Sequence, residues 1–365
     1  MPAALTTKIS TRDDPVTARP KVSDLYEVRQ GDIDRDMDDV LRLWRYLPGD
    51  TPPQREKLDW FYRDNPAGRG LIFFLDYKPE GKPVGVVCLG PREFSIGGQL
   101  TTGTVFGDFA IEPEHRSLGP ALMFQKAFLE LATQQFSIVY GFPNALSGKV
   151  RSFGGHKLGY NLNIFVLPMD FRPYLKRRLS TWVANVLGLA ANFATRIVYP
   201  VRALLKTRGH RVVEYSDEFM NRLWQRLSSS DQQLGTRDAE FVHWRFTRSP
   251  NFQFETLALV NRDGVPAAFA ALRTSEDQVT VVEDAVATDA LAYEALVAFL
   301  TKRFAGRTRA LRFTISEQRG HAEQILAAYW FRKRGSFSAF ATLGTNAPVD
   351  TDVDRVDLSF VDNDV

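Results

Sequence analysis

The sequence is poor in the residues that build covalent or metal-bound frameworks. Its 365 residues include one cysteine, Cys88, and five histidines. A single cysteine excludes an intrachain disulfide framework and any cluster of thiolate ligands, so we expect no metal site. A large basic excess is also missing, because 46 Lys and Arg residues against 43 Asp and Glu residues leave a net charge of +3. This balance argues against a dedicated nucleic-acid-binding protein.

Long apolar runs are missing as well. Residues 1–8 lack the apolar centre of a secretory signal, and no uncharged apolar stretch reaches the length of about 18 residues that a membrane span needs. We therefore expect a cytoplasmic protein. Residues 1–22, rich in Thr, Arg, Asp and Pro, are predicted to be a disordered tail, and residues 346–365 an acidic C-terminal tail. The length that remains predicts two domains or one large one.

The chain contains an internal repeat. Residues 60–66, Trp-Phe-Tyr-Arg-Asp-Asn-Pro, recur as residues 244–250, Trp-Arg-Phe-Thr-Arg-Ser-Pro, 184 positions later. Each copy follows a short strand and an amphipathic helix, and precedes a hairpin, a third strand, a helix, a strand and a short helix. We therefore predict an α/β (α+β) fold with two domains, at residues 23–170 and 211–345. Each would be a mixed, mostly antiparallel sheet flanked by helices.

The segment that joins the halves, residues 171–210, has an unusual composition. It contains eight Arg and Lys residues and no Asp or Glu, and apolar residues recur in it at helical spacing. A basic amphipathic helix of this kind can lie on an anionic membrane surface, which would place the protein at the inner face of the membrane. The alternative is a helix packed between the two domains with its arginines solvated. Both interpretations are open at this point.

The most informative motif lies at residues 107–122, where a strand runs through a tight loop into a helix. Gly119 permits close approach of backbone to a ligand or a positive φ angle, and Pro120 suits the first turn of a helix. Exposed N–H groups at such a helix start, together with the positive end of its dipole, can bind a pyrophosphate.

This loop resembles the hallmark of the GNAT superfamily of acyl-CoA-dependent N-acyltransferases. The family pattern is Arg/Gln-x-x-Gly-x-Gly/Ala, and Arg116, Gly119 and Ala121 match it. Residues 141–144 resemble the family's fifth strand with its following asparagine, and residues 157–160 resemble its closing Lys-Leu-Gly-Phe.

The resemblance covers residues 24–170 but weakens in the second half. The counterpart loop, residues 287–292, contains no glycine and adds Asp289, whose carboxylate would repel a pyrophosphate. The second half is therefore similar to the degenerate repeat of tandem members of the superfamily.

The resemblance implies a set of site residues. Backbone N–H groups near residues 109–111 would bind the oxyanion, at a bulge that splays the strands. Asp108 is the first candidate to accept the amine's proton and Glu112 the second; the alternative for Asp108 is a strand-end carboxylate bonded to backbone or arginine. The family's general-acid tyrosine has no counterpart, because its position is Gly155. Nearby Tyr160 is the candidate that remains. The residues expected to bind acyl-CoA are Phe109, Ala110, Ile111, Arg116, Ser117, Leu118, Gly119, Pro120, Ala121, Asn144 and Ser147.

The implied function is transfer of an acyl group, expected to be acetyl, from acyl-CoA to a primary amine. The acceptor would be an amino sugar or a cell-envelope precursor bound between the halves. Two alternatives are kept: an aminoacyl-tRNA-dependent transferase of the peptidoglycan type, and a non-catalytic GNAT-like binding module. We expect a small-molecule amine as partner, no nucleic acid, and peripheral membrane contact through residues 171–210.

Overall fold

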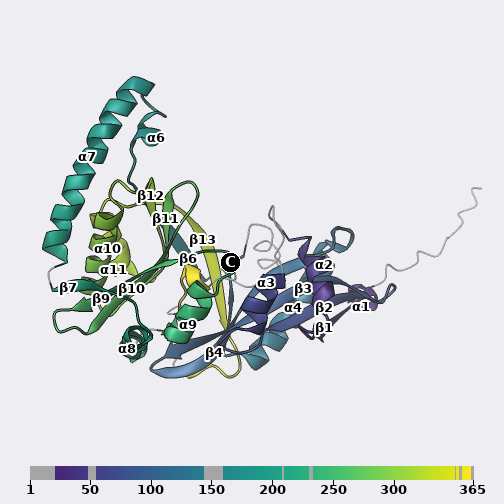
Figure 1. Cartoon of the computed structure of the whole chain (residues 1–365). Coiled ribbons are helices and arrows are strands. Elements are labelled where there is room, and N and C mark those ends of the chain that lie inside the picture. Colours follow the sequence, from purple (N-terminus) through teal and green to yellow (C-terminus); the bar gives the residue numbers. More distant parts are fainter. Residues whose placement is uncertain are drawn as a thin grey trace, which may run out of the picture.

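The computed structural model describes residues 21–47, 55–143, 159–207, 209–229, 233–349, 351–352 and 356–362. The described strands form one large sheet in the order β1-β2-β3-β4-β5-β13-β6-β12-β11-β10-β9-β7, with β8 and β14 beside this path. Two lobes lie along it, the N-terminal half at one end and the C-terminal half at the other (Figure 1). The predicted mixed, mostly antiparallel sheet with flanking helices is confirmed.

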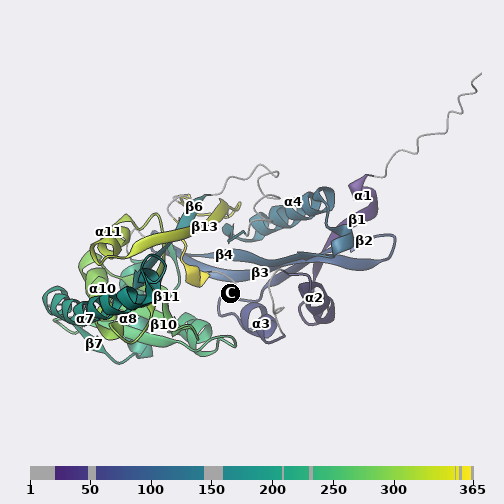
Figure 2. The ribbon, with the colours of Figure 1, turned by 90° about the horizontal axis from the view of Figure 1, so that it is seen from above.

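The first lobe is built around two long strands, β3 and β4. Most of β3 is buried, because helices cover both faces of the sheet, with α4 on one face and α2 and α3 on the other (Figure 2). Helix α2 covers its face of the sheet because it is amphipathic: Val40, Leu43 and Trp44 fall on one side and are buried. The elements are α1 (Val22–Leu25), β1 (Tyr26–Gly31), α2 (Met37–Trp44), α3 (Arg55–Lys57), the π-helix η1 (Leu58–Arg63), β2 (Leu71–Tyr77), β3 (Lys82–Ile96), β4 (Gln99–Ile111), η2 (Pro113–His115), α4 (Leu118–Gln135) and β5 (Ile138–Gly141).

The second lobe repeats this order of elements. Its helix α8 is again amphipathic, and its hairpin β9–β10 is again followed by an antiparallel third strand, β11. The elements are β7 (His210–Val213), α8 (Asp217–Ser228), β8 (Gln233–Gly235), α9 (Ala239–Val242), the π-helix η3 (His243–Thr247), β9 (Glu255–Asn261), β10 (Pro266–Thr274), β11 (Val279–Ala287), α10 (Ala290–Phe304), β12 (Ala310–Ser316), α11 (Gly320–Ala328), β13 (Arg332–Leu343), β14 (Val356–Asp357) and η5 (Phe360–Asp362).

The two lobes exchange their last strands. Strand β6 (Tyr160–Pro168) follows the first lobe in the sequence but pairs with β12 and β13. Strand β13 ends the second repeat, and its residues 340–343 pair with β5 of the first lobe. The predicted domain boundary at residue 170 follows the order of the sequence. In the structure, strand pairing crosses this boundary, because β6 pairs with strands of the second lobe and β13 pairs with β5 of the first.

The repeated tryptophan motif forms the junction between the lobes. The indole Nε1 of Trp60 donates to the carbonyl of Trp244 at 2.8 Å, and the indole of Trp244 donates back to the carbonyl of Trp60 at 2.8 Å. The two rings stack with centroids 5.3 Å apart and belong to one hydrophobic core that both lobes share. The two copies of the repeated motif therefore contact each other, and they occupy equivalent positions in the two halves.

The end of the chain is part of the fold. Strand β14 pairs with β8, and Asp362 is buried between Arg92 of β3 and Arg237, which follows β8. Arg237 also pairs with Asp284 of β11 at 2.8 Å. Within residues 346–365, predicted as an acidic tail, residues 356–362 thus connect the two lobes.

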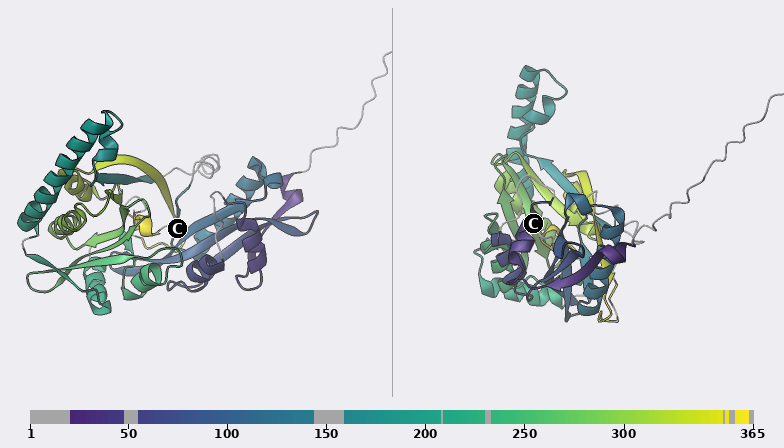
Figure 3. Two further views of the ribbon diagram at one scale, coloured as in Figure 1. Left: turned by 45° about the horizontal axis from the view of Figure 1, so that its top comes forward. Right: turned by 90° about the vertical axis from the view of Figure 1, so that its right-hand side faces the viewer.

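The basic connecting segment forms α6 (Arg172–Leu175) and the long helix α7 (Thr181–Lys206). Helix α7 runs along the outer side of the second lobe, against α10 and away from the first lobe (Figure 1; Figure 3). The alternative of a helix packed between the two domains is therefore wrong. No described helix is long and apolar enough to cross a membrane.

Candidate active site

The site predicted from the sequence begins at a β-bulge in β4. Opposite strand β3, Cys88 pairs with Gly107 and Val86 pairs with Ala110. Asp108 and Phe109 therefore both stand opposite a single residue of β3. Asp108 has a φ of +50°, a left-handed conformation that is uncommon outside glycine. The bulge lies where the resemblance to the N-acyltransferases places it.

The pairing of β4 with β5 ends before the bulge. Their parallel ladder covers Gly103–Val105 of β4 and ends at Tyr140 of β5, while β4 continues to Ile111. The backbone N–H of Glu112 bonds to β3 at 2.8 Å. Because successive N–H groups of a strand point to opposite sides, the N–H of Ile111 points away from β3. The alternation directs the N–H of Ala110 toward β3, so of these two N–H groups only that of Ile111 is left without a place in the β3–β4 ladder.

The start of α4 has no side-chain cap among the described residues. Ser117 is the N-cap, its side chain makes no capping hydrogen bond, and the first turn contains no acidic residue. The helix cannot satisfy the N–H groups of this turn by itself, and the helix dipole adds partial positive charge there. In the second lobe the same place is filled, because N-cap Asp289 accepts a hydrogen bond from the N–H of Ala292 at 2.8 Å. Among the described residues, the start of α4 thus has no side-chain cap, whereas Asp289 caps the start of α10.

The loop residues Gly119 and Arg116 have local structural partners. A Cβ atom at Gly119 would lie 2.9 Å from the side chain of Val22, so the missing side chain makes room for α1 rather than for a ligand. The sequence also suggests a positive φ angle at Gly119. Its φ is not positive in the structure, so this reason for a glycine does not apply. Arg116 donates to the carbonyls of Ile111 and Tyr46, at 2.9 and 3.1 Å, and so fixes the loop to the end of β4.

Asp108, the first candidate base, is held by two neighbours. Its side chain is only 6% exposed, with Lys57 Nζ 2.9 Å from one oxygen and the hydroxyl of Tyr62 donating to the other at 2.8 Å. The alternative interpretation expected backbone or arginine as the partner, whereas these contacts come from a lysine and a tyrosine. The sequence contains no spacing that would have linked Lys57 and Tyr62 to Asp108, since the three meet only because η1 packs against the bulge.

Glu112, the second candidate, lies on the same face of β4 as Asp108, as the alternation predicts. It is buried and forms an ion pair with Arg42 of α2, which also donates to the carbonyl of Pro83. Asn144 and Ser147, and the side chain of Tyr160, lie outside the described residues; only the backbone of Tyr160, in β6, is placed.

We expect Asp108→Asn to lower the free energy of unfolding by about 1–3 kcal/mol, because the amide cannot form the ion pair with Lys57. Acyl-CoA affinity should stay within about twofold, since Asp108 points toward η1 and not toward the start of α4. Urea denaturation and calorimetric titration measure the two quantities. Unchanged stability with a loss of turnover of about 100-fold or more would instead assign Asp108 the role of a general base.

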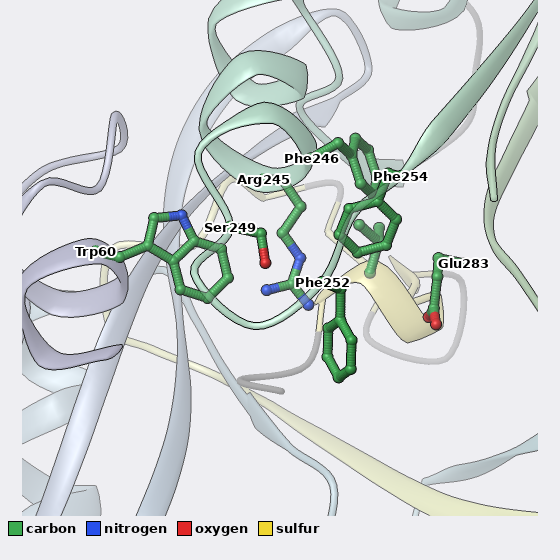
Figure 4. Close-up of a pocket in the computed structure, with 8 residues that line it drawn as sticks. Trp60, Arg245, Phe246, Ser249, Phe252, Phe254 and Glu283 are labelled. Atoms are coloured by element: carbon green, nitrogen blue, oxygen red, sulfur yellow. The ribbon is translucent and has the colours of Figure 1, made fainter. Parts of the chain in front are cut away.

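The second lobe has a bulge too, but its surroundings are filled. Glu283 is the extra residue of β11, and it forms an ion pair with Arg273. The adjacent cavity measures about 10 Å³, room for one water molecule, and Arg245 crosses it between aromatic rings (Figure 4). The residues labelled around it are Trp60, Arg245, Phe246, Ser249, Phe252, Phe254 and Glu283.

A larger pocket of about 430 Å³ lies at the lobe junction, beside Trp244. Asp64, Asp217, Asp238 and Glu240 give it an acidic lining. None of the predicted site residues lines it. Among the described residues, no group of three or more His, Cys, Asp or Glu side chains is arranged to hold a metal ion.

Comparison with solved structures finds the same fold in other proteins. Residues spanning 88% of the chain superpose on 72% of a GCN5-related N-acetyltransferase from Kribbella flavida, with a TM-score of 0.55 and 15% identity. A GCN5-related N-acetyltransferase from Anabaena variabilis matches 87% of the chain over 72% of its own length, with a TM-score of 0.57 and 11% identity. A conserved protein of unknown function from Enterococcus faecalis matches the same shares, 87% and 72%, with a TM-score of 0.60 and 12% identity. The chain therefore has the fold of the GCN5-related N-acetyltransferases. No protein-family model and no curated protein sequence matches it.

Proposed function

We propose that the protein transfers an acyl group from acyl-CoA to a primary amine, at the bulge of β4. The observation that carries the proposal is a contrast between the lobes in the helix that follows each bulge: among the described residues, α4 of the first lobe starts without a side-chain cap, whereas Asp289 caps α10 of the second. An uncapped helix start can bind a pyrophosphate, and a nearby strand N–H group can bind a thioester carbonyl.

The chemistry then follows from the positions of the backbone groups. The amine nitrogen attacks the thioester carbonyl carbon, and the N–H of Ile111 stabilises the negative charge that develops on the carbonyl oxygen. The amine loses a proton, the C–S bond breaks, and the coenzyme thiolate gains a proton. Asp108 and Glu112 are ion-paired. We therefore assign them positioning roles at the bulge, with water accepting the amine's proton, and retain Tyr160 as the candidate acid.

The finer assignments rest on the sequence resemblance. Acetyl-CoA is the proposed donor, and an amino sugar or cell-envelope precursor is the proposed acceptor. Donor binding separates acetyl-CoA from the first alternative, because an aminoacyl-tRNA-dependent enzyme would not depend on acyl-CoA. A turnover assay separates the enzyme from the second, because a non-catalytic module would show no turnover.

The test is a charge placed at the start of α4. Ser117→Asp is expected to weaken acetyl-CoA binding about 100-fold, because unit charges about 5 Å apart near a protein surface repel by about 3 kcal/mol. Ser117→Asn is the matched control, since Asn caps helices as well as Asp without the charge. Calorimetric titration of acetyl-CoA into the wild type and both variants measures the effect. A wild type that does not bind, or an Asp variant that binds as well as the Asn variant, would overturn the proposed donor site.

A further inference from the structure

Helix α7 presents an apolar face to solvent. We call this the outer face of α7, and its side chains are between 37% and 75% exposed: Trp182, Val186, Leu187, Leu189, Phe193, Ile197, Val198, Val201, Leu204 and Leu205. An ordinary surface helix turns its apolar side inward. Here the inward side carries mostly small or polar-tipped residues, among them Ala184, Gly188, Thr195 and Tyr199. Such a continuous exposed apolar surface on a soluble protein marks an interaction site.

The helix is docked firmly, so its outer face is presented permanently. Gly188 packs directly on Arg172 of α6. Arg202 donates to the carbonyl of Ala328 at 2.8 Å and lies over the ring of Tyr329 at 3.9 Å. These contacts, together with the packing of α7 on α10, leave the opposite side of the helix directed away from both lobes (Figure 3).

The charge around this face is of one sign. Residues 171–210 contain no Asp or Glu. The turn before α7 carries Lys176, Arg177 and Arg178, all exposed, and Leu179 and Trp182 follow at once. Lysine and arginine beside exposed aromatic and apolar side chains are the combination that binds anionic lipid headgroups and inserts below them.

We propose that the outer face of α7 binds the surface of an anionic lipid bilayer, with the helix lying in the plane of the interface. The face from Trp182 to Leu205 is about 35 Å long at 1.5 Å per residue, so the whole helix can lie flat. A second copy of the chain would bring the same cations to the contact, whereas anionic headgroups are complementary to them. The proposal does not depend on acyl transfer.

The test is flotation of the full-length protein with phosphatidylcholine vesicles that contain or lack phosphatidylglycerol. We expect flotation that requires phosphatidylglycerol. The double variant Phe193→Asn/Ile197→Asn should reduce the bound fraction about tenfold, because it removes two apolar side chains from the centre of the face. Its melting temperature should stay unchanged, since both side chains are more than half exposed in the protein.

Leu100→Asn is the matched control, because Leu100 is similarly exposed, at 58%, on the β3–β4 hairpin far from α7. It should float like the wild type. Replacing Lys176, Arg177 and Arg178 by Gln should remove the dependence on phosphatidylglycerol. A wild type that does not bind, or a double variant that floats as well as the wild type, would overturn the proposal. A vesicle-independent dimer that the double variant dissociates would assign the face to a second copy instead.

Discussion

Replacing Asp362 by asparagine is expected to lower the free energy of unfolding by about 3–5 kcal/mol, although the residue lies three positions from the end of the chain. Its side chain is fully buried, and its two oxygens face Arg92 at 3.0 Å and Arg237 at 3.2 Å. An amide has nearly the same shape but carries no charge. The ion pairs of Asp362 with Arg92 and Arg237 would be lost, and the ion pair of Arg237 with Asp284 would remain. Urea denaturation of the two proteins measures the difference. Asp263→Asn, in the exposed β9–β10 turn, should change stability by less than about 0.5 kcal/mol.

The same carboxylate predicts how stability depends on pH. Burial by itself would raise the pKa of Asp362, but Arg237 and Arg92 outweigh burial and lower it to about 2. The ordinary value is about 3.9, so the folded protein holds the charged form more strongly than the unfolded chain does. The resulting stability is present above about pH 4 and is lost as the pH falls toward 2. The gap between the wild type and the asparagine variant should therefore narrow at pH 3 relative to pH 6, and a constant gap would contradict this account.

The second large effect is expected at the lobe junction. Trp60→Ala and Trp244→Ala should each cost about 3–5 kcal/mol, because each removes a buried ring and one of the two reciprocal hydrogen bonds. The double variant should cost less than the sum by about 1–2 kcal/mol, since either single change already breaks the stacking and leaves the partner's ring unsupported. Urea denaturation of the four proteins completes the cycle.

Trp182→Ala is the control for this pair, because Trp182 is 75% exposed on α7 and its loss should change stability by less than about 0.5 kcal/mol. Additive effects at Trp60 and Trp244 would mean that the two rings support the lobes independently, contrary to the reciprocal geometry.

Local patterns in the sequence predicted much of the fold. The hairpins and the strand–loop–helix motif around Gly119 depend on residues close in the chain, and the structure contains each of them. The repeat of Trp60 at Trp244 spans 184 positions but is visible because each copy is a local motif. The bulge at Asp108 was reached through the family resemblance and not from spacing.

The rest depends on partners distant in the sequence. Lys57 and Asp108 are 51 positions apart, and Arg42 and Glu112 are 70 apart, so no periodicity links them. The exchange of β6 and β13 and the burial of Asp362 are likewise decided by packing between the lobes. The sequence does not exclude a position between the lobes for the basic helix, whereas packing on α10 places α7 on the outer side of the second lobe.

The exchanged strands also set the order in which the protein can be completed during synthesis. Strand β5 ends at Gly141, but the strand that covers its free edge, β13, is not finished until Leu343. About 200 residues must be translated in between, which takes roughly 10–40 s at 5–20 residues per second. During that interval the edge of β5 that β13 pairs with in the complete protein has not yet met its partner strand, and an unpaired edge of this kind is open to pairing with another chain.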